Sequence, residues 1–415
     1  MNLDNLILYR PLTKSIMDDQ PLSHFYKWIH EPQIYEFDFF NQLLAFKEQF
    51  PIDGQLFQSY LTLLLAYHEN PFTLALERKE VLSDAFQQIV YHDLKEIYAL
   101  YHFDFSSLNP LIQPLFNHYH IQNHSMDKDV HTILSLLCKK LKESQNVQEF
   151  YDELEKHYET YGVGFYGLNK AFRFENHELV PIGHVENYKL NDIVGYESQK
   201  ERLVSNTLAF LKGQKANNVL LYGDSGTGKS TSIKALLNEY YDQGLRIVEV
   251  YKHQFQNIPE IIHILQKRKY KFIIYMDDLS FENFELEYKY LKSVIEGGLE
   301  EKPDNIVIYA TSNRRHLVKE TWSDREHNDE VNLNDTMQEK LSLVNRFGIT
   351  ILYSKPAKKE YLDIVDNLAL KYELNLDKEK LHQEALTWEI RNGGFSGRTA
   401  QQFIQYMINQ KAIEE

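Results

Sequence analysis

The first 160 residues carry apolar side chains at the three- and four-residue spacing of amphipathic helices. Two apolar stripes are the clearest: Phe39, Leu43, Phe46 and Phe50, and Ile133, Leu136, Leu137 and Leu141. An apolar run at residues 61–66, within residues 55–68, also fits a buried helix. We predict an all-α N-terminal domain over residues 1–160. Its many Tyr and Phe side chains are expected to pack inside a helical bundle and not to form a ligand-stacking surface.

Residues 161–190 break this helical pattern. Gly162, Gly164 and Gly167 disfavour a continuous helix. Two short apolar segments, residues 171–174 and 178–181, flank a polar Glu-Asn-His turn and resemble a β-hairpin. We predict a linker or short β element over residues 161–190.

Short, nearly continuous apolar runs then alternate with helical stretches. The five runs are residues 218–222, 246–250, 272–276, 305–310 and 349–353. Such strands, separated by helices, are typical of a parallel sheet covered on both faces. We therefore predict an α/β core over residues 191–355. Residues 356–415 return to helical spacing, with apolar stripes at Tyr361, Ile364, Val365 and Leu368 and at Phe403, Ile404 and Met407.

Charge is unevenly distributed along the chain. The net charge is −15, and residues 1–180 hold 14 basic and 25 acidic side chains, whereas residues 181–415 hold 31 and 35. An acidic N-terminal half argues against direct binding of nucleic acid by that half. It is compatible with a protein partner that itself holds nucleic acid.

Membrane and secretory features are not evident in the sequence. No run approaches the roughly 18 apolar residues that a membrane span needs, and residues 1–10 lack the pattern of a signal peptide. The single cysteine, Cys138, lies in an apolar helical run, so we expect a buried structural thiol. These observations favour a cytoplasmic protein without a membrane partner.

The strongest chemical signal is a phosphate-binding loop. It is the segment Gly223-Asp224-Ser225-Gly226-Thr227-Gly228-Lys229-Ser230, followed by Thr231. This segment matches G-x-x-x-x-G-K-[ST] between an apolar run and an amphipathic helix. The glycines let backbone N–H groups converge on a phosphate, and the helix N-terminus adds partial positive charge. Lys229 is expected to reach the terminal phosphates of ATP, and Ser230 to ligate Mg²⁺.

Polar residues follow two of the apolar runs. Asp277 and Asp278 end the run at residues 272–276, which is the Walker B arrangement. We expect Asp277 to hold Mg²⁺ and Asp278 to polarise the attacking water. Asn313 ends the next run and is expected to orient that water or to contact the γ-phosphate.

The order of these motifs resembles that of an AAA+ ATPase. Asp192-Ile193-Val194-Gly195 is similar to the segment of that superfamily that contacts adenine, which implies roles for Ile193 and Val194. The segment at residues 343–348 resembles the box that carries an arginine finger, here Arg346. The segment at residues 393–398 resembles the sensor-2 motif of a helical lid, here Arg398.

In more detail, residues 277–281, 310–316 and 346–348 are similar to a family of bacterial AAA+ proteins known only by a domain-of-unknown-function label. The compact core is also distantly like that of helicase loaders. The resemblance implies ATP hydrolysis with Mg²⁺, a lid over residues 356–415, and a homo-oligomer in which Arg346 acts on the neighbour's ATP. A protein client is expected to be bound through the N-terminal domain and remodelled or switched.

Two other functions stay open. One is a helicase-loader-like module that acts on a DNA-bound protein. The other is a non-hydrolysing ATP-dependent switch, because Asp278 is one CH₂ shorter than the Glu usual at this position. Two interpretations of Arg314, Arg315 and His316 are equally compatible with the sequence. These residues could contact a neighbouring subunit or nucleic acid, or they could form a solvated turn. The basic run at residues 267–271 is typical of a solvated flank, and residues 317–337 of an exposed insertion.

Overall fold

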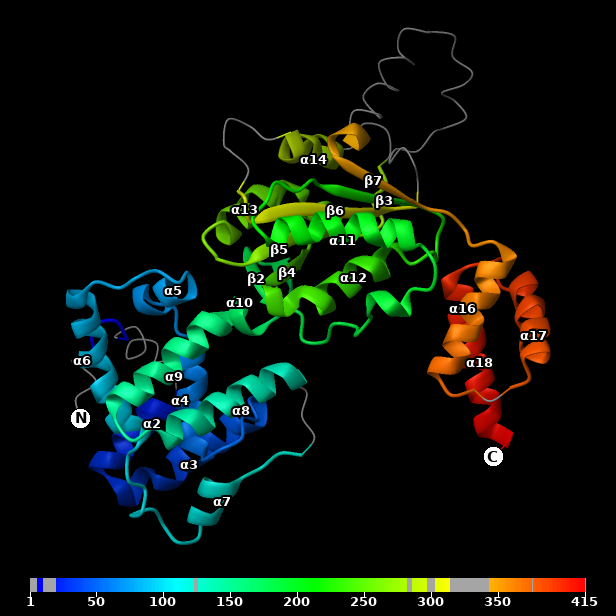
Figure 1. Cartoon of the computed structure of the whole chain (residues 1–415). Coiled ribbons are helices and arrows are strands. Elements are labelled where there is room, and N and C mark those ends of the chain that lie inside the picture. The colour runs from blue at the N-terminus through cyan, green and yellow to red at the C-terminus, as the bar shows by residue number, and fades with distance from the viewer. Residues whose placement is uncertain are drawn as a thin grey trace. The chain divides into compact units, whose positions relative to one another are not determined.

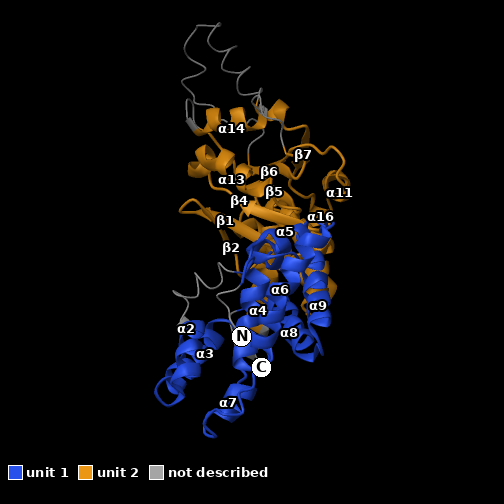
Figure 2. Ribbon diagram, turned by 90° about the vertical axis from the view of Figure 1, so that its left-hand side faces the viewer, with its two compact units in different colours: residues 1–169 blue, residues 170–415 orange. Residues whose placement is uncertain are grey.

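The structure is a computed structural model of the 415-residue chain. It describes residues 6–9, 20–122, 126–281, 286–296, 303–313, 343–374 and 376–414. The chain forms two compact units, residues 1–169 and 170–415, which Figure 2 distinguishes by colour. Each unit has its own hydrophobic core.

The first unit is helical throughout its described part, which confirms the predicted all-α N-terminal region (Figure 1). Its helices are α2 (Gln20–His30), α3 (Pro32–Gln49), α4 (Leu56–Tyr67), α5 (Pro71–Glu77), α6 (Asp84–Tyr101), α7 (Gln113–His118), α8 (Lys128–Glu143), α9 (Val147–Thr160) and α10 (Gly164–Leu168). Helix α4 contains no charged residue, and most of its side chains are buried. It is therefore the central helix of this unit.

Aromatic side chains fill the interior of the first unit, as predicted. The rings of Phe25 and Phe57 stack with their centroids 4.7 Å apart, and Trp28 stacks on Phe105 at 5.7 Å. Such ring pairs stabilise a core beyond the area that they bury. Cys138 is buried as expected, and its backbone carbonyl accepts a hydrogen bond from the Tyr101 hydroxyl at 3.1 Å.

The second unit is built on a seven-stranded sheet in the order β2-β1-β4-β5-β6-β3-β7. The strands are β1 (Ala171–Glu175), β2 (Glu178–Pro181), β3 (Val219–Gly223), β4 (Leu245–Glu249), β5 (Lys271–Met276), β6 (Ile306–Ser312) and β7 (Ile349–Tyr353). The five strands predicted for the core are all present, and every pairing is parallel except that of β1 with β2. The predicted hairpin also forms. It extends the main sheet by pairing β1 with β4, which the sequence pattern did not predict.

Helices cover both faces of this sheet (Figure 1). They are α11 (Glu197–Leu211), α12 (Lys229–Tyr240), α13 (Ile258–Leu265) and α14 (Leu286–Glu296), with short 3₁₀ turns at Leu190–Asp192, Tyr241–Gln243 and Lys252–Asn257. The chain moves from β3 to β4 in one direction across the sheet and from β4 through β5 to β6 in the other. Right-handed crossovers therefore place α12 on one face and α13 and α14 on the opposite face.

A helical segment follows β7, which confirms the predicted C-terminal lid fold. Its helices are α16 (Lys358–Lys371), α17 (Lys378–Arg391) and α18 (Gly397–Glu414). Residues of both predicted stripes meet in a small core, where Tyr361 and Val365 lie in the same cluster as Phe403 and Ile404.

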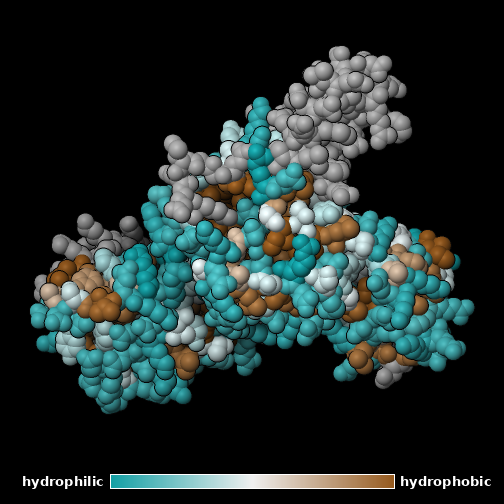
Figure 3. All heavy atoms as spheres, turned by 45° about the horizontal axis from the view of Figure 1, so that its top comes forward, coloured by the Kyte–Doolittle hydropathy of each residue, from teal (hydrophilic) through white to brown (hydrophobic). Residues whose placement is uncertain are grey.

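Among the described residues, none of the helices combines the length and the apolar character that crossing a bilayer requires. On the face shown in Figure 3, hydrophobic side chains lie in small groups among hydrophilic ones.

A buried carboxylate ties the N-terminal segment to the first unit. Asp93 on α6 is fully buried, and its side chain accepts hydrogen bonds from three consecutive backbone N–H groups. The donors are Ile7 (3.0 Å), Leu8 (2.7 Å) and Tyr9 (3.1 Å). Three N–H groups that face one carboxylate form a small anion-binding nest.

We predict that Asp93→Asn destabilises the first unit by about 3 kcal/mol. The Asn side chain has no negative charge, and its NH₂ group would face the backbone N–H donors of residues 7–9. Asp84→Asn, at an exposed position on the same helix, is the matched control. Hydrogen exchange of peptides from residues 20–168 in the full chain measures the effect. Equal protection in the two variants would rule out the nest as a stabilising contact.

Candidate active site

The phosphate loop begins at a backbone position that only glycine fits. Gly223 ends β3 with φ +132°, and a Cβ atom placed there would lie 2.1 Å from the carbonyl oxygen of Tyr353 on the neighbouring strand β7. The next residue continues this attachment, since the Asp224 N–H donates to the same oxygen at 3.0 Å. The Asp224 carboxylate accepts the Lys355 N–H at 2.9 Å. The loop is therefore fixed to the end of β7 before it turns toward α12.

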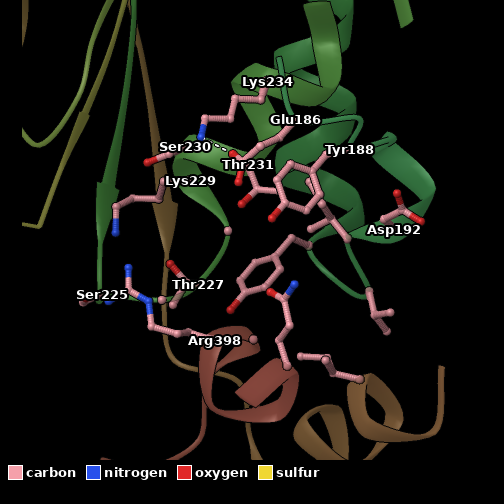
Figure 4. A pocket seen from close by; sticks show the side chains of 18 of the residues that line it. Glu186, Tyr188, Asp192, Ser225, Thr227, Lys229, Ser230, Thr231, Lys234 and Arg398 are labelled. Carbon is pink, nitrogen blue, oxygen red and sulfur yellow. Dashed lines mark hydrogen bonds and ion pairs between the residues drawn. The ribbon is translucent and has the colours of Figure 1, made fainter. Parts of the chain in front are cut away.

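A cavity of about 500 Å³ lies at the carboxyl ends of β3, β5 and β6 (Figure 4). Neighbouring helices cover opposite faces of the sheet here, and such crevices are where open α/β sheets bind ligands. The predicted site residues that line it are Ile193, Val194, Ser225, Gly226, Thr227, Gly228, Lys229, Ser230, Thr231, Asp277, Asp278, Asn313 and Arg398. Gly223 and Asp224 shape the loop without lining the cavity, and Arg346 lies outside it.

Lys229 connects the loop to the neighbouring strand β6. Its Nζ donates to the carbonyl oxygens of Gly223 at 3.0 Å and Asp224 at 2.6 Å, and to Asn313 Oδ1 at 3.0 Å. Burial lowers the pKa of Lys229, although the carboxylates of Asp278, Asp224 and Asp277 act in the opposite direction. A buried ammonium group at the N-terminus of a helix suits a phosphate ligand.

Asp277 is paired with the first residues of α12. Its Oδ1 accepts a hydrogen bond from Ser230 Oγ at 2.7 Å and a short one from the Thr311 hydroxyl. Burial raises the pKa of Asp277, but hydrogen bonds from Thr311 and Ser230 outweigh this effect, and the net result is a lowered pKa. The carboxylate is therefore ionised at neutral pH beside a hydroxyl oxygen, a donor set that suits a hard divalent cation.

Asp278 and Asn313 form a second polar pair. Asp278 has a left-handed backbone with φ +50°, and its N–H donates to Thr311 Oγ1 at 2.9 Å. Asn313 Nδ2 donates to Asp278 Oδ1 at 2.7 Å. The turn directs the Asp278 carboxylate toward Asn313, the residue that follows β6, so the two side chains predicted to act on the attacking water lie in direct contact.

The C-terminal helices contact the loop directly. Arg398, at the start of α18, donates its N–H to the Gly226 carbonyl at 3.3 Å. A Cβ atom on Gly226 would meet Arg398 Cβ and Ser396 Oγ at 3.1 Å each, so this position also favours glycine. Lys371 on α16 forms an ion pair of 2.7 Å with Asp192, which precedes the loop in sequence. The C-terminal helices are therefore attached both to the phosphate loop and to the segment that precedes it.

Comparison with protein families matches residues 168–411, more than half of the chain, to one family described as "Protein of unknown function (DUF815)". The chain belongs to the DUF815 family. Its mainly parallel sheet, phosphate loop and C-terminal helices agree with the AAA+ P-loop fold predicted from the sequence.

Two curated proteins share local similarity with this DUF815 chain. The large subunit of replication factor C from Methanococcus vannielii is 41% identical over 59 residues, which are 14% of this chain and 12% of that protein. The corresponding subunit from Staphylothermus marinus is 35% identical over 77 residues, 18% of each chain. The chain thus spans less than a fifth of the length of these relatives.

Solved structures of two RuvB mutants from Thermotoga maritima also align with the DUF815 chain. The first has a TM-score of 0.39 and 16% identity, over 54% of this chain and 66% of that one. The second has a TM-score of 0.33 and 15% identity, over 54% of this chain and 72% of that one.

The cavity of this DUF815 chain is also lined by residues that the sequence motifs did not predict. Apolar side chains of Ile364 and Leu368, with Tyr372, join Ile193 and Val194 at the lid side. Polar additions are Glu186, Tyr188, Asp192, Tyr196, Lys234, Thr311, Lys371 and Gln401. Lys234 pairs with Glu186, as the dashed line in Figure 4 shows. Lys234 follows Ser230 by four residues on α12, so helical spacing was a signal that could have identified it.

Arg346 lies in the short helical segment before β7 and is half-buried. It does not line the cavity of its own DUF815 chain. Arg314, Arg315, His316 and residues 317–337 lie outside the described residues, so the predictions for them stay predictions.

Proposed function

We propose that this chain binds ATP with Mg²⁺ in the cavity and hydrolyses it. The observation that carries the proposal is the meeting of the phosphate loop, the Ser230–Asp277 pair and the Asp278–Asn313 pair at one crevice. These groups come from separate elements, and each has a role in phosphoryl transfer. Apolar residues on the lid side of the same cavity fit a purine base.

The donor groups fit the charges of Mg·ATP. Loop N–H groups and Lys229 suit the phosphates, and Ser230 with Asp277 would hold the cation. Bound Mg²⁺ would offset charge on the phosphate oxygens. Asp278 would accept the proton of the attacking water, Asn313 would orient that water, and Arg398 would stabilise charge on the transferred phosphoryl group.

We further propose that the site is completed by a second copy of the chain. Arg346 lies outside the cavity of its own subunit, which fits an arginine that acts on a neighbour's ATP. Arginine fingers of this kind raise turnover by about 10³–10⁵-fold. The helical first unit would bind a protein client, and the ATP cycle would remodel or switch it.

Two alternatives have specific support. A non-hydrolysing switch is favoured by the short side chain of Asp278, whose Oδ1 is already held by Asn313 at 2.7 Å. A loader-like role on a DNA-bound protein is favoured by the local similarity to replication factor C large subunits. Measured ATP turnover excludes the switch, and DNA-stimulated turnover favours the loader-like role.

We predict that Asp278→Asn keeps Mg·ATP bound but slows turnover by about 10²–10⁴-fold, because an amide cannot accept the proton of the water. The control is Asp242→Asn, an exposed acid outside the cavity. Phosphate release and calorimetric ATP binding are measured on the same samples. Wild-type turnover in Asp278→Asn would show that another group activates the water.

We predict that Arg346→Ala subunits lose turnover by about 10³-fold or more and regain part of it when mixed with Lys229→Ala subunits. A mixed interface pairs an intact cavity with an intact arginine. Specific activity of the wild type should also rise with protein concentration. Arg391→Ala, at the end of α17, is the control. Concentration-independent turnover together with failed complementation would show that Arg346 only stabilises its own subunit.

A further inference from the structure

Tyr275 lies on the strand that delivers Asp277 to the cavity. Side chains alternate along a strand, so Tyr275 and Asp277, two residues apart, point to the same face of β5. Tyr275 packs there in the cluster that includes Ile233 and Leu236 of α12, and only 3% of its surface is exposed. Its ring is thus held under the helix that carries Ser230.

The hydroxyl group of Tyr275 is buried without a hydrogen-bond partner of acceptable geometry among the described residues. Its strand leads directly to Asp277, whose Oδ1 accepts the Ser230 hydroxyl at 2.7 Å. A phenol has a pKa of about 10 in water, so the Tyr275 hydroxyl carries its proton at neutral pH and can donate to the proposed cation-binding pair. Buried polar groups are nearly always paired, so this one calls for an explanation.

Two other tyrosines on this face of the sheet provide the comparison. Tyr309 on β6 is the register partner of Tyr275, and its hydroxyl contacts Asn206 and Thr207, each at 2.9 Å. Tyr353 on β7 lies 3.0 Å from the Ser232 hydroxyl. The hydroxyl groups of both residues stabilise the fold through hydrogen bonds. That of Tyr275 has no such use in the structure and lies beside Ser230 and Asp277.

We propose that Tyr275 is a positioning residue for the cation: its hydroxyl donates to the Asp277 carboxylate when Mg·nucleotide is bound. This inference rests on the proposed function. An ionised carboxylate has about four acceptor positions, and Asp277 Oδ1 already receives Ser230 and Thr311. A third donor would fix the carboxylate while Ser230 turns its oxygen to the cation. Groups that hold metal ligands in this way typically change metal affinity about 10–100-fold.

The test compares single hydroxyl deletions in the full chain. Binding of a fluorescent ATP analogue is titrated with Mg²⁺, and again in EDTA, for wild type, Tyr275→Phe and Tyr309→Phe. We expect Tyr275→Phe to need about 10-fold more Mg²⁺ for half-maximal binding, with unchanged affinity in EDTA and little loss of thermal stability. Tyr309→Phe should keep the wild-type Mg²⁺ dependence and lower the melting temperature. Asp277→Asn is the positive control for weakened Mg²⁺ dependence.

An unchanged Mg²⁺ dependence in folded Tyr275→Phe would overturn the inference. If that variant does not fold, Tyr275→Met, which also lacks the hydroxyl, is expected to show the same shift, and wild-type Mg²⁺ dependence in it would be equally decisive. Failure of the wild type to bind the nucleotide at all would instead contradict the proposed function. The two failures are therefore distinguishable.

Discussion

The close approach of two backbones at the end of β3 is the constraint on which the site depends. Gly223 passes so near the Tyr353 carbonyl that a methyl group would lie 2.1 Å from that oxygen. The Asp224 N–H donates to the same oxygen and its carboxylate accepts the Lys355 N–H, so the loop starts in one fixed direction. The convergence of the loop on the cavity, and the position of α12 behind it, follow from this attachment.

The charged groups in the cavity are held by hydrogen bonds with neutral polar groups. Lys229 is held by two carbonyl oxygens and by Asn313, while Asn313 also holds Asp278. Asp277 is held separately by Ser230 and Thr311. A ligand with several phosphate oxygens and a divalent cation offers partners to every one of these groups. Because the strands β5 and β6 and the loop after β3 all contribute, a single ligand would bridge them.

Much of the fold and of the candidate site could be predicted from the sequence. Strands β3, β4, β5 and β6 have nearly continuous apolar runs because both of their faces are largely buried, and this pattern can be recognised without a structure. The phosphate loop and the acids at 277 and 278 are contiguous motifs, so the sequence alone identifies them. Their meeting with Asn313 follows from the rule that parallel strands end at one edge.

Other features depend on contacts between distant segments. The pairing of β1 with β4, the ion pair of Lys371 with Asp192, and the partners of Asp93 join residues far apart in sequence. Contacts of this kind leave no periodic pattern in the sequence, so they could not be predicted from it. The phosphate-loop motif predicts that Gly223 and Asp224 contact the ligand. In the structure these two residues attach the loop to the end of β7, and they do not line the cavity.

We propose that Lys229 and the loop around it bind the phosphates of ATP. Calorimetric titration of Mg·ATP into wild type, Lys229→Ala and the exposed control Lys212→Ala measures this binding. We expect saturable binding to wild type and to Lys212→Ala, and affinity about 10–100-fold lower for Lys229→Ala, since one charged hydrogen bond contributes about 1.5–3 kcal/mol. Equal affinity of folded Lys229→Ala and wild type would contradict it.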